Sequence, residues 1–478
     1  MSPVTLAARL ARLRADAARL LPLVWPVLVG QLAMVAFGTI DTVLAGRASA
    51  GDLAALAVGA AAYLSVFIGL MGVVMGLAPI VGQQFGAGRH AQAGRQVHQA
   101  VWLALGLALL GDLALLFPQP FLAIARVSPE VALKVRLYLA ALALSLPAAL
   151  LFTVYRAFNN AIGQPRAVMR IQLLGLGLKG PLSALLVFGW PAAGVPALGV
   201  LGCGVATVAA MWLQLILAWR ALRRDAHVAP FALLGRGLDR PRRAPILEQL
   251  RIGGPSGLAI MVEVTAFAFM SIFIARLGTV PVAGHQIAFN LVSLLFMVPM
   301  SIGIATSMIA AQRIGAGDAG DARRISLHGL ALGSAAALVL GGVVFAARQP
   351  LVGLYTGDAA VAAIALALMA WLVLFHLVDA VQVVAASALR AYKVVVWPAV
   401  VYTLAMWGLG LGGGYVLGFD IGGGMPTALH GPRGFWVAST VGLTVVALAL
   451  TWLLTQVSRQ RLRDAPGAAA APGGPSAP

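Results

Sequence analysis

Long apolar stretches alternate with short polar segments along the 478 residues of this chain. An apolar stretch of about twenty residues is long enough for an α-helix to cross the hydrocarbon core of a bilayer. The pattern therefore predicts twelve membrane-spanning helices. They are expected at residues 20–45, 53–82, 97–117, 133–156, 168–190, 197–220, 249–275, 282–310, 325–347, 360–389, 394–418 and 434–457.

The two halves of the chain repeat each other at a distance of 229 residues without a gap. The matched positions are Pro26 with Pro255, Arg47 with Arg276, Ala54 with Ala283, Gln83 with Gln312, Gly86-Ala87-Gly88 with Gly315-Ala316-Gly317, and Arg95 with Arg324. Six spans in each half give both halves the same orientation. The predicted fold is an all-α polytopic membrane protein, with two six-helix lobes related by a pseudo-two-fold axis along the membrane normal. Such a duplication is typical of transporters, whose substrate path lies where the halves meet.

Composition supports a membrane protein. Hydrophobic residues make up 61% of the chain and charged residues only 10%, with a mean hydropathy of +0.93, whereas soluble domains are about one quarter charged. The net charge of +18 does not indicate nucleic-acid binding, because the chain has no basic folded domain. The basic residues instead suit topology and an anionic inner leaflet.

The basic residues also predict the orientation. With a cytoplasmic N-terminus, 25 of the 33 Lys and Arg fall on the cytoplasmic side and 7 on the other. This asymmetry follows the positive-inside rule. Both termini are expected in the cytoplasm, in a multi-pass protein of the cell inner membrane. The first nineteen residues are amphipathic and lack the features of a signal peptide, so we expect the first span to be retained.

Polar segments divide the chain into five predicted regions. These are a cytoplasmic N-terminal segment 1–19, an N-lobe 20–220, a cytoplasmic linker 221–247, a C-lobe 248–458 and a disordered cytoplasmic tail 459–478. The single cysteine, Cys203, excludes a disulfide within the chain. No Walker sequence follows the Gly-Ala-Gly turns. We therefore expect an ion gradient, rather than ATP hydrolysis by that route, to drive transport, with no cofactor.

Ionisable residues deep in a span are costly, by about 3 kcal/mol on insertion scales, and usually mark a pathway. Glu263 and Asp379 lie too deep to reach water, and Asp41 lies in the outer part of the first span. Lys179 is central in the fifth span, and Asp112 lies where it could reach the outer headgroups. His376 is expected to pack between helices or to orient a carboxylate, because no second His or Cys stands at ligand spacing.

Several motifs resemble the MATE family, the multidrug and toxic compound extrusion transporters, and in particular its NorM-like branch. They cover residues 20–457 and include the segments 22–31, 40–46, 284–290, 297–303 and 389–393. The resemblance implies two lobes around a central cleft and exchange of an organic cation for Na⁺ or H⁺. It assigns cation binding to Glu263 and Asp379, with Na⁺ as a candidate metal ion at both, and matches Asp41 to the acidic residue of the N-lobe. We expect all three carboxylates to take part in cation or proton coupling.

The resemblance and the sequence together give candidates for the substrate path: Lys179, Phe296, Phe375, His376, Gln382, Gln31 and Asn290. The expected partners are small-molecule organic cations, drugs and membrane lipids, bound by a monomer. Lys179 stands where the family usually has Asn, and Phe296 and Phe375 stand where some relatives have Tyr. An ammonium near Asp41 would repel a metal ion, so we predict that Lys179 pairs with Asp41 in place of one.

Other classes remain as alternatives. A flippase of lipid-linked sugars from the same superfamily could share the twelve spans and the duplication, but would be expected to line its cleft with several Arg. An ion channel would need no rocking halves and would show uncoupled conductance. A membrane enzyme is disfavoured because the sequence has no recognisable metal or nucleophile constellation. Neither the natural substrate nor the choice between Na⁺ and H⁺ follows from the sequence.

Overall fold

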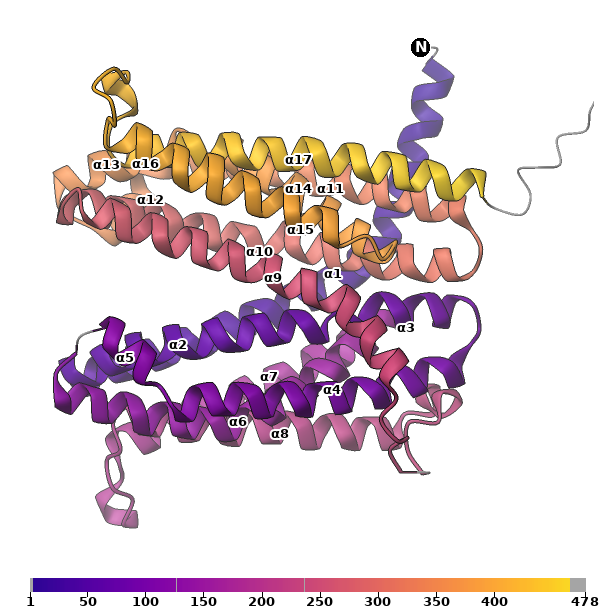
Figure 1. The fold of residues 1–478 in the computed structure, drawn as a ribbon, viewed down its shortest axis with the longest axis horizontal. Helices are drawn as coiled ribbons and strands as arrows, with labels where there is room; N and C mark the ends of the chain where they lie inside the picture. Colours follow the sequence, from indigo (N-terminus) through magenta and orange to yellow (C-terminus); the bar gives the residue numbers. More distant parts are fainter. Residues whose placement is uncertain (1–2, 126, 236, 465–478) are drawn as a thin grey trace, which may run out of the picture. The chain divides into compact units, whose positions relative to one another are not determined.

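The structure is a computed structural model that describes residues 3–125, 127–235 and 237–464. Helices dominate this part of the chain, and its β pairing is one isolated bridge between Trp190 and Val195. The first half forms α1 (Pro3–Ala48), α2 (Ala50–Val74), α3 (Leu77–Gly86), α4 (His90–Leu116), α5 (Gln119–Ala125), α6 (Pro129–Ala161), α7 (Pro165–Phe188) and α8 (Val200–Arg224). The all-α prediction is confirmed (Figure 1).

The second half begins with α9 (Arg243–Ala275), α10 (Thr279–Gly315), α11 (Ala319–Ala346), α12 (Arg348–Tyr355) and α13 (Ala359–Met369). It continues with α14 (Leu372–Ala391), α15 (Val396–Thr403), α16 (Gly413–Gly418) and α17 (Pro432–Arg463). Within the described residues, 12 helical segments are long and apolar enough to cross a membrane. The predicted number of spans is therefore confirmed.

Two predicted spans are less regular than the sequence suggested. The predicted span 360–389 is wrong as one helix, because turn residues Ala370 and Trp371 separate α13 from α14. The predicted span 394–418 contains a π-helical stretch, Leu404–Gly412, between α15 and α16. This stretch is rich in glycine, which allows more backbone conformations than other residues. The backbone can therefore depart here from the regular hydrogen bonding of an α-helix. The predicted tail also begins later, because α17 continues to Arg463; residues 465–478 lie outside the described part.

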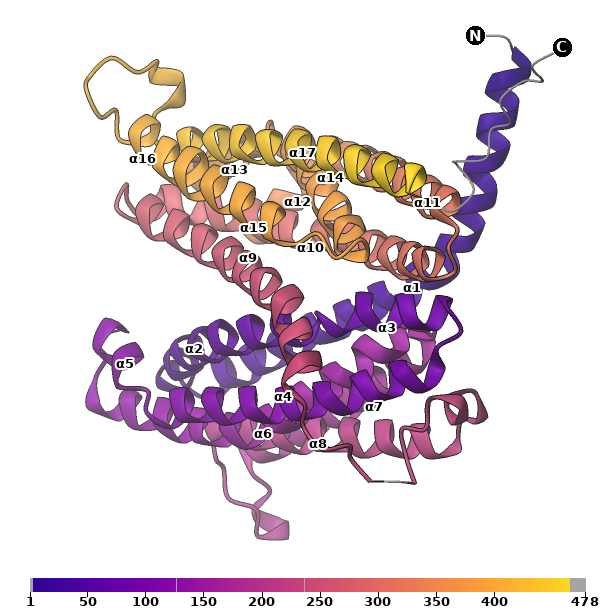
Figure 2. The same ribbon diagram turned by 45° about the vertical axis from the view of Figure 1, so that its right-hand side comes forward.

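The chain forms two compact units. Of the described residues, those from 3 to 21, 82 to 88 and 266 to 464 form unit 1, and those between 22 and 81 and between 89 and 265 form unit 2. In unit 1, α14 packs against α10, α11 and α17; in unit 2, α6 packs against α2, α4 and α8. Figure 2 shows these helices side by side within each unit. The compact units differ from the sequence halves, since the start of α1 and the end of α3 join unit 1 and most of α9 joins unit 2.

Ion pairs hold the start of α1 in unit 1. Both terminal nitrogens of Arg19 donate hydrogen bonds to Asp321, NH1 to Oδ1 at 3.1 Å and NH2 to Oδ2 at 2.9 Å. Asp16, whose side chain is buried, accepts from Arg324 Nε at 2.9 Å and lies 2.6 Å from His328 Nδ1. The helix therefore extends well before the first predicted span, because Asp16 and Arg19 of α1 form ion pairs with residues of α11.

Matched glycines make reciprocal close contacts in unit 1. A Cβ added to Gly86 would overlap the carbonyl oxygen of Gln312, and one added to Gly315 would overlap the carbonyl oxygen of Gln83. These four residues are two pairs related by the 229-residue repeat. The ends of α3 and α10 approach each other so closely that any side chain at either glycine would displace backbone.

The predicted linker 221–247 is mostly a folded strap. Residues 225–235 and 237–242 lie between α8 and α9, and the 3₁₀ helix Ala226–Phe231 packs on α4. Gln99 uses both ends of its amide, donating to Arg240 O at 3.0 Å and accepting from Arg242 N at 2.7 Å. Trp102 Nε1 donates to Asp239 O at 2.9 Å. These contacts fix the strap by its backbone within unit 2.

Candidate functional site: a neutralised carboxylate in unit 2 and an unpaired carboxylate in unit 1

Lys179 and Asp41 form a buried ion pair in unit 2. The Lys179 ammonium on α7 lies 2.7 Å from Asp41 Oδ1 on α1, and the two residues are 0% and 6% exposed. The ammonium also donates to Thr207 Oγ1 at 2.7 Å and to the carbonyl oxygen of Cys203 at 2.8 Å, both on α8. The predicted pairing is confirmed.

Three acceptors match the three N–H donors of a lysine ammonium. Ser183 Oγ, on the turn of α7 that follows Lys179, lies 3.5 Å from Asp41 Oδ1 and adds a weak donor. A buried charge that loses its partner costs about 3–5 kcal/mol, so each side chain holds the other ionised. The Asp41 carboxylate is thus already neutralised by a cation that belongs to the chain.

Asp379 has a different environment. It lies on α14 in unit 1, is 5% exposed, and accepts a hydrogen bond from Gln382 Nε2 at 3.1 Å one turn later. No lysine, arginine or histidine lies within 4 Å of it in the described part of the chain. An amide donor leaves the negative charge uncompensated, and burying such a charge is costly. Asp379 is therefore suited to binding a proton or a cation.

Aromatic rings lie beside Asp379 in unit 1. Phe375, one helical turn earlier on α14, is buried, with its ring 5.3 Å from the Trp436 ring and 6.3 Å from the Phe267 ring. Aromatic faces attract organic cations. Phe375 has no hydroxyl, so it supplies a ring face but no oxygen ligand.

The two buried histidines of unit 1 differ in their hydrogen bonds. His285 Nδ1 accepts from Trp436 Nε1 at 3.1 Å, and its Nε2 lies 3.0 Å from Ser271 Oγ. Because the indole can only donate, the Nε2 of a neutral His285 carries the proton. His376 is also fully buried, but neither ring nitrogen has a hydrogen-bond partner among the described residues. Since Gln382 rather than His376 donates to Asp379, His376 does not orient that carboxylate in this structure. Its place in the substrate path stays a prediction.

The other predicted residues are more dispersed. Glu263 is half-buried on α9 within unit 2, whereas Asp379 belongs to unit 1, so their action as a pair stays a prediction. Gln31 on α1 and Phe296 on α10 are half-buried. Asn290 on α10 is exposed, and its Oδ1 accepts from Tyr355 OH at 3.4 Å.

The described residues offer few side chains that could together bind a metal ion. The described residues contain no group of three or more His, Cys, Asp or Glu side chains placed to hold a metal ion. Around Asp379, Gln382 turns its Nε2 toward the carboxylate and so presents a donor to it.

Sequence reasoning missed one buried cation. The predicted span 133–156 ends at Arg156, but Arg156 lies within α6, which continues to Ala161, and is only 9% exposed. A signal was present, because Arg156-Ala157-Phe158 resembles Arg390-Ala391-Tyr392 in the second half.

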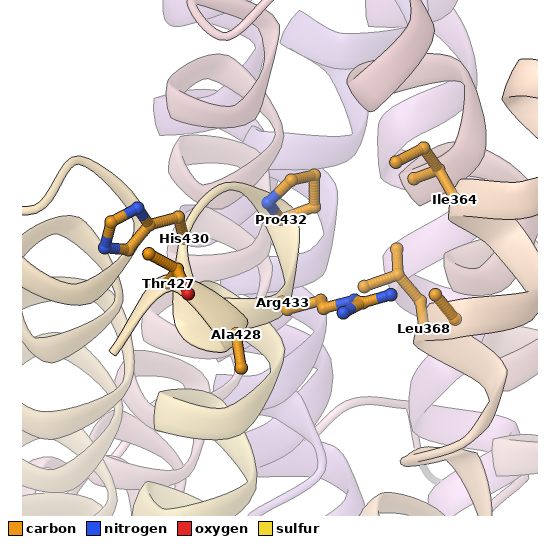
Figure 3. Close-up of a pocket in the computed structure, with 8 residues that line it drawn as sticks. Ile364, Leu368, Thr427, Ala428, His430, Pro432 and Arg433 are labelled. Atoms are coloured by element: carbon orange, nitrogen blue, oxygen red, sulfur yellow. The ribbon is translucent and has the colours of Figure 1, made fainter. Parts of the chain in front are cut away.

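A pocket lies elsewhere in unit 1. It is formed by α13, the segment before α17 and the first turn of α17, with Arg433 and Leu368 on facing sides (Figure 3). None of the predicted site residues lines it.

Comparison with known proteins gives a consistent match. The MatE family profile matches residues 26–185 and 255–456. The chain is 40% identical to a probable multidrug resistance protein NorM of Aromatoleum aromaticum, covering 93% of this chain and 95% of the relative. It is 36% identical to the multidrug resistance protein PmpM of Pseudomonas aeruginosa, covering 97% and 96% of the two chains, and 35% identical to NorM of Vibrio cholerae, covering 94% and 97%.

Solved structures share the fold. The eukaryotic MATE transporter AtDTX14 superposes with a TM-score of 0.81 at 19% identity, covering 95% of this chain and 100% of that one. The Vibrio cholerae MATE transporter VcmN, in its bent form, also gives 0.81, at 18% identity and 94% and 99% coverage.

Proposed function

The chain belongs to the MATE family, in its NorM-like branch, and on that premise we propose that it is a secondary active multidrug efflux antiporter. It exports organic cations and takes up H⁺ or Na⁺ in exchange. Family membership also makes it a multi-pass membrane transporter rather than an enzyme. The names of the curated relatives, which are multidrug resistance proteins, support drugs as the substrates.

The environment of Asp379 carries this proposal. It is a buried carboxylate with one amide donor and no cationic side chain within 4 Å among the described residues. Its negative charge can be neutralised by a proton, by an inorganic cation or by the amine of a drug. Since one carboxylate is satisfied by one positive charge, these ligands compete, and the binding of one promotes the release of another.

The small number of oxygen atoms available as ligands around Asp379 favours H⁺ over Na⁺ as the coupling ion. Hard metal cations are held by shells of several oxygen ligands. Phe375 offers no oxygen, and Gln382 would have to turn its amide over to replace its donor with an oxygen ligand. A proton needs only one carboxylate oxygen, and the adjoining aromatic faces suit an organic cation.

Lys179 gives unit 2 a separate role. Because the Lys179 ammonium neutralises Asp41 in this structure, our proposal gives Asp41 no part in ion exchange. Coupling then depends on Asp379, with Glu263 as a second acidic residue on α9. Alternating access follows if the outward-open state binds the ion more tightly and the inward-open state binds the drug more tightly. The protein works as a monomer in the inner membrane, with both termini in the cytoplasm.

Ethidium efflux from cells provides the test. Cells that express the chain are loaded with ethidium and energised, and efflux is followed with and without a protonophore, in sodium-containing and sodium-free medium. The proposal expects efflux that the protonophore abolishes and that continues without Na⁺. Efflux that requires Na⁺ and survives the protonophore would assign coupling to Na⁺, and a complete lack of expression-dependent efflux would reject multidrug export.

A further inference from the structure

The pocket at the start of α17 places a basic side chain opposite an apolar wall. Its volume is about 180 Å³, and it lies wholly within unit 1. The wall is formed by Ile364, Ala367 and Leu368 of α13. Arg433, in the first turn of α17, extends across the pocket toward Leu368 (Figure 3). The 3₁₀ turn Thr427–Leu429 lies on the side of the pocket away from α13.

The guanidinium of Arg433 is available to a ligand. Among the described residues, no acceptor takes a hydrogen bond from it and no carboxylate lies within 4 Å of it. Two other arginines of unit 1 have partners of their own. Arg348 NH1 donates to the carbonyl oxygen of Phe345 at 2.8 Å, and the Arg276 guanidinium lies 5.4 Å from the centre of the Phe419 ring. Because arginine keeps its charge in proteins, Arg433 presents a cation to the pocket.

The loop before α17 uses its other titratable groups internally. His430 Nε2 lies 3.0 Å from the carbonyl oxygen of Met425 and 3.7 Å from Asp420 Oδ2. Asp420 Oδ1 in turn accepts from Met425 N at 3.0 Å. A carbonyl oxygen can only accept, so the Nε2 of a neutral His430 carries the proton. The His430 ring points away from α13 (Figure 3), and Arg433 remains the cation that faces the apolar wall.

The lining suits an anion that carries an apolar part. A guanidinium fork binds phosphate oxygens with two parallel hydrogen bonds. Thr427, whose hydroxyl makes no hydrogen bond with another described residue, adds a donor to the same pocket. Pockets for drug-sized ligands have volumes of about 300–1,000 Å³. The smaller volume here fits one polar group of a ligand rather than a whole drug.

The pocket lies at the end of a membrane span. α17 is one of the helical segments that are long and apolar enough to cross a membrane, and Arg433 lies in its first turn. The ends of such helices reach the level of the lipid headgroups. Farther along α17 the exposed side chains include Val441, Val445 and Leu448. An acyl chain would find an apolar surface there, below a cation that faces the headgroup.

We propose that this pocket binds the phosphate diester of an anionic phospholipid, with Arg433 as its main ligand and the acyl chains along the exposed face of α17. A headgroup without an amine of its own leaves the charge of the phosphate to the guanidinium. The inference goes beyond the proposed function, because none of the residues assigned to coupling or to the substrate path lines this pocket.

Two lipids that differ at the phosphate test the proposal. Dioleoylphosphatidylglycerol has the phosphate diester, and dioleoylglycerol has the same acyl chains without it. Native mass spectrometry of the purified, delipidated full chain in detergent measures the affinity for the first bound lipid. Wild-type protein should bind phosphatidylglycerol at least about fivefold more tightly, the factor that one basic residue contributes near an anionic headgroup. Equal affinities would overturn the proposal.

Variants separate the pocket from the general charge of the protein. Arg433→Gln should weaken phosphatidylglycerol binding at least about fivefold and leave dioleoylglycerol binding unchanged. Arg433→Lys keeps the charge but loses the fork, so its loss should be smaller. Ala428→Phe fills the pocket from an exposed position without changing any charge, and should weaken phosphatidylglycerol binding. The matched control is Arg136→Gln, which removes a charge from an exposed position of α6 in unit 2 and should change nothing.

Each other result overturns the lipid site. Unchanged binding by Arg433→Gln, or equal losses in Arg433→Gln and Arg136→Gln, would mean that Arg433 acts at most through the general charge of the surface. A loss in Arg433→Gln with none in Ala428→Phe would place the lipid outside the pocket. Displacement of phosphatidylglycerol by an equal concentration of inorganic phosphate would make this a site for free anions. If Ala428→Phe does not fold, the two Arg433 variants and the Arg136 control decide.

Discussion

The ammonium of Lys179 lies 2.7 Å from Asp41 Oδ1, and both groups are buried in unit 2. The chain thereby supplies its own cation to the acidic residue of the N-lobe. Under the proposed function, Asp41 keeps this internal partner, and Asp379 in unit 1 is the carboxylate that exchanges a proton or a cation.

A double-mutant cycle measures the pair. Lys179→Met and Asp41→Asn should each destabilise the protein by about 3–5 kcal/mol, because each leaves the other charge buried and alone. The double variant should be more stable than either single one. Thermal unfolding in detergent gives the three values. Additive effects would mean that the two charges do not interact.

The sequence predicted this pair because charged residues are rare in the spans and a buried ammonium needs a partner. It also predicted the twelve spans, since length and hydropathy determine them. It did not predict the break at Ala370–Trp371, because α13 and α14 are both apolar and follow each other directly. Gln382 as the donor to Asp379 and the burial of Arg156 depend on side-chain directions and helix packing, which a hydropathy pattern does not contain.

The reciprocal glycine contacts predict equal sensitivity at two distant positions. Gly86→Ala and Gly315→Ala should each lower stability by about 1–3 kcal/mol or more, because the new Cβ overlaps a backbone carbonyl that cannot rotate away. Gly106→Ala is the matched control, since no atom lies within 4 Å of a Cβ there. Melting temperatures of the purified variants test this, and a normal stability of either contact variant would show that the helix ends separate freely.

Orientation is tested with single cysteines. Ala229 is exposed on the strap and Ala192 is exposed in the segment between α7 and α8. A cysteine at Ala192 should react with a membrane-impermeant maleimide in intact cells, and one at Ala229 only after permeabilisation. The native Cys203 is buried and serves as the background. Labelling of Ala229→Cys in intact cells would reverse the proposed topology.

Glu263 is expected to contribute to coupling. Glu263→Gln should strongly reduce proton-driven ethidium efflux while the protein remains in the membrane, because α9 carries this half-buried carboxylate within a membrane span. Glu130→Gln controls for the loss of an acidic residue, since the Glu130 side chain is 79% exposed at the start of α6. Normal efflux by Glu263→Gln would leave Asp379 as the sole coupling carboxylate.

The most direct test of the account uses purified protein in proteoliposomes, with ethidium transport driven by an imposed pH gradient and no Na⁺. Wild-type protein should transport, and Asp379→Asn should lose this response because a neutral amide cannot exchange a proton for a cation. The Lys179→Met, Asp41→Asn double variant should retain it, since it removes only the internally neutralised pair. Proton-driven transport by Asp379→Asn would contradict the assignment of coupling to Asp379. So would a result in which the double variant loses transport and Asp379→Asn keeps it.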